Sequence, residues 1–200
     1  MRKAIITRKT GETDIKLILS LDRPLTGRAA EIIVNTGVGF LDHMLTLFAA
    51  HGHFGLTAEC SGDLEVDAHH TVEDMGIALG QAFNNALGER RGITRYGSAL
   101  LPMDEALAMV AADISGRAHL TYEVNAGSET VGAMDAGLIE EFFLGFTRAA
   151  GITLHIRQFS GKNAHHIIEA VFKGFGRAMA QAAAPDERLT GGIPSTKGVL

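Results

Sequence analysis

The chain has 200 residues, of which 46% are hydrophobic and 20% charged, as in an ordinary globular protein. Its formal net charge of −5 argues against nonspecific binding to a nucleic-acid backbone. No apolar run is as long as a membrane span, and the N-terminus has no apolar run of signal-peptide length. We therefore expect a cytoplasmic protein with no nucleic-acid or membrane partner. Cys60 is the only cysteine, which excludes a disulfide framework and a cysteine-based zinc site.

The first half of the chain predicts elements in the order β-β-β-α-β-α. The strands, from β-type alternation and composition, are expected at Ala4–Lys9, Asp14–Ser20, Glu31–Val34 and Leu56–Cys60. The helices are expected at Phe40–Ala50 and at about His69–Leu87. Gly88 supplies a stop for the second helix.

The second half predicts the same order again. Its strands are expected at Ile93–Leu100, Ala106–Ile114, His119–Val124 and Ile152–Gln158. Its helices are expected at Leu138–Ala150 and His165–Ala184. Residue types also match between the halves: Gly39–Asp42 answers Gly137–Glu140, and Ser61-Gly62 answers Ser160-Gly161. These agreements indicate an internal duplication.

The duplication predicts an α+β fold with helices packed on one face of each small sheet. We expect a single domain, residues 1–200, made of two similar halves, about 1–90 and 91–184, followed by a tail at 185–200. The exposed faces of such units favour assembly into a homo-oligomer.

A motif of the form His-His-x-x-Glu opens the last helix of each half. It occupies His69–Glu73 in the first half and His165–Glu169 in the second. Positions i and i+4 share one helix face, so the first histidine and the glutamate of each motif can bind one cation. The second histidines, His70 and His166, point about 100° away and are expected to reach another cation. A single copy would equally fit surface histidines, but two equivalent copies favour a two-metal site.

Two further positions complete the predicted ligand set. His43, on the helix Phe40–Ala50, is the best additional ligand in the first half, and Glu141 occupies the aligned position in the second. Both side-chain types accept a divalent cation. Histidine and carboxylate together favour Mn(II), Fe(II) or Zn(II) over Mg(II) or Ca(II), and the spacing does not choose among the first three.

Five separated motifs carry a family resemblance across essentially the whole chain. They are Gly39–Met44, Asp67–Asp74, Leu154–Arg157, Gly161–Glu169 and Ile193–Leu200. Together they resemble, in the same order, the motifs of the imidazoleglycerol-phosphate dehydratases of histidine biosynthesis. The resemblance implies a duplicated α+β fold, two Mn(II) ions per active site, active sites formed between subunits and a hollow homo-oligomer, a 24-mer in the family. Many relatives have His where this chain has Glu141.

The resemblance also implies a reaction, in which a hydro-lyase removes water from imidazoleglycerol phosphate and yields imidazole acetol phosphate. The carbon that loses its proton has no neighbouring carbonyl, so two cations on the ring nitrogens are expected to favour the imidazolate, which can expel the adjacent hydroxyl. By resemblance Glu12 is the acid/base group. We group His70 and His166 with it as candidate catalytic residues.

The resemblance assigns contacts to a small phosphorylated imidazole substrate. They are Glu12, His51, Arg95, Arg117, Ser195 and Lys197. Cationic and hydroxyl donors suit the phosphate, and Lys197 is expected to close over it from the tail. Without the resemblance, Glu12 would be interpreted as a solvated turn residue, His51 as a helix C-terminal cap and each arginine as a surface residue.

Two other function classes remain open from the residues alone. A metal-storage oligomer would have no use for Arg95, Arg117 and Lys197, so binding of a phosphorylated ligand distinguishes it from an enzyme. A two-metal hydrolase would keep a metal-bound water as its nucleophile, and only the resemblance argues against it.

Overall fold

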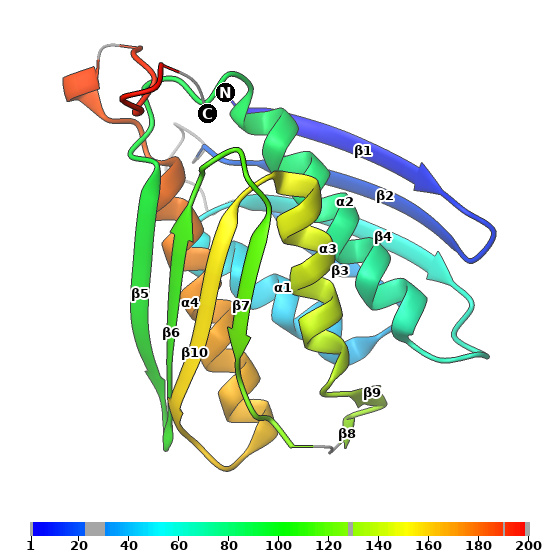
Figure 1. Ribbon diagram of the computed structural model, residues 1–200. Helices are drawn as coiled ribbons and strands as arrows, with labels where there is room; N and C mark the ends of the chain where they lie inside the picture. The colour runs from blue at the N-terminus through cyan, green and yellow to red at the C-terminus, as the bar shows by residue number, and fades with distance from the viewer. Residues whose placement is uncertain (1, 23–30, 128–129, 190, 199–200) are drawn as a thin grey trace.

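Two four-stranded sheets enclose the helices of the chain (Figure 1). The computed structural model describes residues 2–22, 31–127, 130–189 and 191–198. In these ranges, the helices of each half cover one face of that half's sheet and meet the helices of the other half. The predicted α+β fold with helices on one sheet face is therefore confirmed.

The first half forms the sheet with strand order β1-β2-β4-β3. Its strands are β1 (Lys3–Lys9), β2 (Thr13–Ser20), β3 (Ile32–Asn35) and β4 (Gly55–Gly62). Its helices are α1 (Gly39–Gly52) and α2 (His69–Leu87). Alternate residues of β2, namely Ile15, Leu17 and Leu19, are fully buried, because successive side chains of a strand point to opposite faces and only one face meets the helices.

The second half repeats this arrangement with strand order β5-β6-β10-β7. Its strands are β5 (Tyr96–Met103), β6 (Ala106–Asp113), β7 (His119–Glu123) and β10 (Thr153–Ser160). Its helices are α3 (Leu138–Ala150) and α4 (Ala164–Ala183). β3 runs parallel to β4, and β7 runs parallel to β10. Each strand thus occupies the place of its counterpart, as the duplication predicts.

The halves pack crosswise, α1 on α4 and α2 on α3, through glycines that let helix backbones touch. A Cβ atom at Gly176 would lie 2.4 Å from the Phe48 carbonyl oxygen and 2.9 Å from the Gly52 nitrogen. A Cβ atom at Gly80 would lie 2.5 Å from the Phe146 oxygen and 3.1 Å from the Ala150 nitrogen. These are the same contacts at duplicated positions, so the two halves are related by an approximate twofold axis.

Phenylalanines fill the space between the helices. Phe143 on α3 has its ring centroid 5.2 Å from those of Phe172 and Phe175 on α4, and all three side chains are fully buried. Because this cluster takes residues from α3 and α4 and reaches Phe48 of α1, at 4.7 Å from Phe175, one hydrophobic core extends across both halves.

Some boundaries and one hairpin differ from the sequence prediction. β5 begins at Tyr96 rather than Ile93, because Thr94 and Arg95 donate backbone hydrogen bonds to the end of α4. The short strands β8 (Thr130–Val131) and β9 (Met134–Asp135) were not predicted, since two-residue strands leave no periodic pattern. The predicted tail contains a 3₁₀ helix, Glu187–Leu189; its residues 190, 199 and 200 lie outside the described ranges. None of the helices described is long and apolar enough to cross a membrane.

Candidate active site

Three side chains from α1 and α4 form a candidate metal site. The Nε2 atom of His43 lies 2.6 Å from Oε1 of Glu169, and Nε2 of His165 lies 3.4 Å from the same oxygen. One ligand atom from each of the three lies within 4.8 Å of the other two. Two imidazoles and a carboxylate at this separation fit a divalent transition metal.

Helix packing explains why these three side chains meet. Gly176 brings α4 against α1, so His43 near the start of α1 faces the start of α4, where His165 and Glu169 share a face one turn apart. The sequence names His43 as a candidate ligand contributed by the first half, without assigning it to an ion. The structure brings it to the motif of the second half, because the helices pack crosswise.

Glu169 is an ionised, buried carboxylate. Burial by itself raises its pKa, but hydrogen bonds from Lys173 Nζ, at 2.7 Å, and from His43 hold the pKa at about 2. Lys173 lies one turn beyond Glu169 on α4 and was not identified from the sequence. The i+4 spacing from Glu169, which places the two side chains on one helix face, could have identified Lys173.

The first-half motif presents a similar pair on α2. Nε2 of His69 lies 3.8 Å from Oε2 of Glu73. Glu141 is half-buried on α3, one turn before Gly145, and a Cβ atom at Gly145 would lie 2.9 Å from the backbone oxygen of Glu73. The structure therefore places Glu141 on the helix that packs against the His69/Glu73 motif, and its role as a ligand remains a prediction.

The second histidines of the two motifs each contact a carboxylate through Nδ1. Nδ1 of His70 lies 2.9 Å from Oδ2 of Asp63, and Nδ1 of His166 lies 2.8 Å from Oε2 of Glu105. These hydrogen bonds raise the pKa of both imidazoles. The sequence did not single out Asp63 or Glu105. Glu105 precedes a strand as Glu12 does, so the duplication could have identified it, whereas the counterpart of Asp63 is Lys162 and gave no such signal.

Glu12 lies in the turn between β1 and β2. Its Oε1 atom is 3.7 Å from Nε2 of His70, and its side chain is 54% exposed. The turn is held by the Thr10 hydroxyl, which accepts the backbone N–H of Glu12 at 3.1 Å, and by the Asp63 N–H, which donates to the Glu12 carbonyl at 3.1 Å. The structure thus brings a solvent-accessible carboxylate beside the first-half motif, where an acid/base group can exchange protons.

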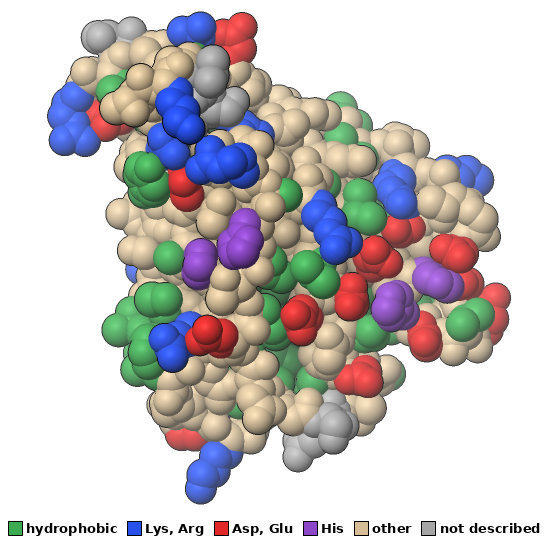
Figure 2. Space-filling view, viewed as in Figure 1, with side chains coloured by type: hydrophobic (Ala, Val, Ile, Leu, Met, Phe, Trp, Pro, Cys, Tyr) green, Lys and Arg blue, Asp and Glu red, His purple; other side chains and the backbone are tan. Residues whose placement is uncertain are grey.

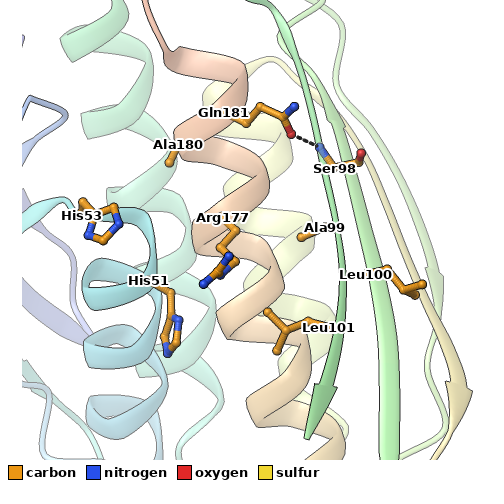
Figure 3. Close-up of a pocket in the computed structure, with 9 residues that line it drawn as sticks. All are labelled: His51, His53, Ser98, Ala99, Leu100, Leu101, Arg177, Ala180 and Gln181. Carbon is orange, nitrogen blue, oxygen red and sulfur yellow. Dashed lines mark hydrogen bonds between the residues drawn. The ribbon is translucent and has the colours of Figure 1, made fainter.

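His51 lines a pocket of about 390 Å³ between α1, α4 and β5 (Figure 3). Arg177 of α4 faces the same pocket, and the Gln181 side chain accepts a hydrogen bond from the Ser98 backbone. Burial, and then the charges of Lys173 and Arg177, lower the pKa of His51. A neutral imidazole near neutral pH follows, which can accept or donate a hydrogen bond.

The structure keeps the other predicted substrate contacts away from the metal motifs of the same chain. Arg95 bonds to Asp113 at 2.7 Å and to the Pro194 carbonyl at 2.7 Å, which ties the tail carrying Ser195 and Lys197 to this end of the molecule. The Arg95 N–H donates to Ala182 at the end of α4, whereas His165 lies at the start of that helix. At 1.5 Å per residue the helix separates them by about 25 Å.

The candidate metal ligands and the cationic side chains near the tail also lie apart on the surface. Arg117 is exposed in the turn after β6, the same end of β6 at which Asp113 holds Arg95. In Figure 2, a group of Lys and Arg side chains surrounds the region where the chain ends lie, while a pair of histidines lies among acidic side chains near the start of α2. One chain therefore offers the metal ligands and the tail-side cations at different places.

Known proteins resemble this chain along its full length. A family model described as imidazoleglycerol-phosphate dehydratase matches residues 36–179. The imidazoleglycerol-phosphate dehydratase of Acetivibrio thermocellus is 53% identical over 199 residues, which cover 100% of this chain and 99% of the relative. That of Gluconacetobacter diazotrophicus is 54% identical over 199 residues, 100% of this chain and 98% of the relative. The chain belongs to the imidazoleglycerol-phosphate dehydratase family.

Solved structures of imidazoleglycerol-phosphate dehydratases share the fold. The enzyme of Pyrococcus furiosus in complex with (S)-C348 matches with a TM-score of 0.81 and 40% identity, over 98% of this chain and 100% of that one. The enzyme of Staphylococcus aureus matches with a TM-score of 0.80 and 39% identity, over 92% and 99%. A dehydratase is a hydro-lyase, so the enzyme class expected from the motifs is confirmed, and so is the family resemblance.

Proposed function

We propose that this imidazoleglycerol-phosphate dehydratase homologue converts imidazoleglycerol phosphate into imidazole acetol phosphate in the histidine pathway of the cytoplasm, using two Mn(II) ions per active site. The observation that carries the proposal is the meeting of His43, His165 and Glu169, which belong to the family motifs and come from different halves of the chain. A metal site that requires both halves is unlike chance surface histidines and supports a site built by the fold.

The helix packing supports two separate sets of metal ligands. His43, His165 and Glu169 would hold one ion, and His69, Glu73 and Glu141 are proposed to hold the other through the equivalent packing of α2 on α3. His70 and His166, whose Nδ1 atoms contact Asp63 and Glu105, are proposed to complete a neighbouring site through Nε2. When bound, the ions lower the pKa of the substrate's imidazole and favour its anionic form.

Glu12 is proposed to move the proton. Dehydration removes a C–H proton and the hydroxyl group of the adjacent carbon, and the enol that results becomes the ketone. This exposed carboxylate, 3.7 Å from His70, can accept the C–H proton and deliver it to the neighbouring carbon as the enol becomes the ketone. The enol O–H proton then combines with the departing hydroxide as water. Glu105, the matching carboxylate of the second half, is held by hydrogen bonds that depress its pKa to about 2, which makes it a weak base.

The phosphate contacts are proposed to come from a second subunit. Arg95, Arg117 and Lys197 lie at the end of the molecule opposite the start of α4, so they would complete a site only on a neighbouring copy. Exposed apolar side chains on the sheets support such an assembly. They are Ile5, Ile33, Tyr96, Leu100 and Phe159, exposed by 62%, 49%, 55%, 62% and 56%. We propose a 24-subunit assembly on family grounds.

The test is direct turnover. Metal-free protein is reconstituted with Mn(II), Fe(II) or Zn(II) and given imidazoleglycerol phosphate, and the ketone product and free inorganic phosphate are both measured by NMR. We expect ketone with Mn(II), no ketone without metal and no phosphate release. Phosphate release would support a two-metal hydrolase instead, and the absence of ketone with all three metals would refute the proposal.

A further inference from the structure

The two duplicated hairpin turns use their carboxylates differently. Glu12 immediately precedes β2, and Glu105 immediately precedes β6. In the strand registers Asp14 pairs with Ser61 and Leu107 pairs with Ser160, and these serines are counterparts in the duplication. Glu12 and Glu105 therefore occupy the same corner of the two halves, two residues before the paired position.

Glu105 is fully engaged at its corner. Its Oε2 atom lies 2.8 Å from Nδ1 of His166. Its Oε1 atom accepts the backbone N–H groups of Lys162, at 3.2 Å, and Asn163, at 2.9 Å. These residues form the entry to α4, where Asn163 caps the helix by accepting from His165 N–H at 2.9 Å. Three hydrogen bonds thus fix the carboxylate against both the helix start and the imidazole.

In the first half, a different residue holds the equivalent histidine. Asp63, from the loop between β4 and α2, places Oδ2 2.9 Å from Nδ1 of His70. Glu12 instead lies on the opposite side of that ring, 3.7 Å from Nε2, as Asp104 lies 3.8 Å from Nε2 of His166 in the second half. The Nδ1 contact is therefore made in both halves, by the turn carboxylate Glu105 in the second and by the loop carboxylate Asp63 in the first. Glu12 does not make this contact.

The chemistry of neutral imidazole gives this contact a consequence. A neutral ring carries one N–H, and a carboxylate can only accept a hydrogen bond, so the proton sits on Nδ1 and the lone pair of Nε2 is free to bind a metal. Carboxylates of this kind set the tautomer and orientation of metal-ligating histidines, and their loss typically lowers metal affinity by about 10- to 100-fold.

We propose that Glu105 is a positioning residue that holds His166 as the Nδ1–H tautomer with Nε2 directed at a metal ion, and that Asp63 does the same for His70, which leaves Glu12 available for proton transfer. The metal and the proton transfer rest on the proposed function, whereas the tautomers do not.

The sharpest variant is Glu105→Gln, which keeps the shape of the side chain but reverses one hydrogen bond. The two backbone N–H donors keep Oε1 of the glutamine in place, so its NH₂ group faces Nδ1 of His166. That nitrogen must then accept, which moves the ring proton to Nε2 and blocks the metal-binding lone pair. A residue that only capped the entry to α4 would be replaced by glutamine without loss.

The readout is the tautomer of His166 in metal-free protein, measured by solid-state ¹⁵N NMR with labelled histidine at a pH that leaves the ring neutral. A His166→Gln variant identifies the signal by its loss. In wild type we expect Nδ1 protonated on both His70 and His166, and in Glu105→Gln we expect Nδ1 of His166 unprotonated. The Mn(II) dissociation constant of one site should rise about 10- to 100-fold. Glu89→Gln, an exposed carboxylate paired with Arg91, is the matched control and should change neither quantity.

Two results would overturn the inference. One is an Nε2–H tautomer at His70 or His166 in the wild type, a measurement that does not depend on any variant folding. The other is a folded Glu105→Gln protein with unchanged tautomer and unchanged Mn(II) affinity. A protein with the expected tautomers and metal affinities that forms no ketone would instead refute the proposed function and leave the positioning role standing.

Discussion

Replacing Gly176 by alanine should destabilise the protein and weaken its metal site together. The new Cβ atom would lie 2.4 Å from the Phe48 carbonyl oxygen and 2.9 Å from the Gly52 nitrogen, whereas ordinary contacts begin at 3.4 Å. Both neighbours are backbone atoms of α1 and cannot rotate away. The helices must separate by about 1 Å to restore normal contact, in a core as closely packed as an organic crystal.

The magnitude follows from two opposed effects. Overpacking a well-packed core costs about 1–3 kcal/mol, and the rigid backbone on both sides favours the upper end. Alanine in place of glycine within a helix returns about 1 kcal/mol. We therefore expect a net loss of about 2 kcal/mol in the free energy of unfolding, or a melting temperature lower by about 4–8 °C for a chain of this length. His43 on α1 and Glu169 on α4, now 2.6 Å apart, should separate and bind Mn(II) more weakly.

The assay is thermal unfolding of metal-free protein at one fixed protein concentration, followed by Mn(II) titration. Gly80→Ala should behave like Gly176→Ala, because a Cβ atom there would lie 2.5 Å from the Phe146 oxygen. Gly39→Ala is the control within α1, since no atom beyond its chain neighbours and its own helix backbone lies within 4 Å of its Cβ position. If Gly176→Ala has the same melting temperature as Gly39→Ala and keeps its Mn(II) affinity, the close helix contact does not support the site as described.

Four further outcomes can be measured on the same protein. Glu12→Gln should lower turnover by about 10²- to 10⁴-fold while substrate binding is largely kept, because the amide cannot carry a proton; near-normal kcat would reject the role. Lys197→Ala and Arg117→Ala should each weaken binding of the phosphorylated substrate by about 1.5–3 kcal/mol without changing metal content, and equal dissociation constants would place the phosphate elsewhere. Glu141→Ala should lose one metal on dialysis and Glu141→His should keep both, so full occupancy with wild-type affinity in the alanine variant removes Glu141 from the ligand set. Chelation should abolish turnover and shrink the assembly on size-exclusion chromatography; turnover in verified metal-free protein contradicts the two-metal proposal, and an unchanged size contradicts only metal crosslinking.

The sequence predicted the features that depend on local residue patterns, namely the strands, the helices and the duplication. Alternating apolar residues such as Ile15, Leu17 and Leu19 predicted a strand with one buried face, and the repeated His-His-x-x-Glu motif predicted both the duplication and the helix starts. These signals depend on spacing within a few residues, which helix and strand geometry convert directly into a shared face.

What the sequence did not predict depends on which helices touch. No local pattern says that α1 packs on α4, because that contact depends on glycines such as Gly176 meeting a distant backbone. The sequence therefore named His43 as a candidate ligand but could not say which motif it would meet. Asp63 and Glu105 were missed for a related reason: each is an ordinary acidic residue of a loop or turn until the fold sets it beside an imidazole.

The crosswise packing of the helices bears on how such a chain could have arisen. A half-length ancestor with one β-β-β-α-β-α unit would have carried the residues of α1 and α2 but could have brought them together only by pairing with a second copy of itself. Joining two copies in one chain makes that pairing intramolecular, so the meeting of these metal-ligand side chains no longer depends on protein concentration. It also lets the two copies of a residue differ in role: the turn carboxylate Glu105 contacts a histidine, while its counterpart Glu12 is proposed to transfer a proton.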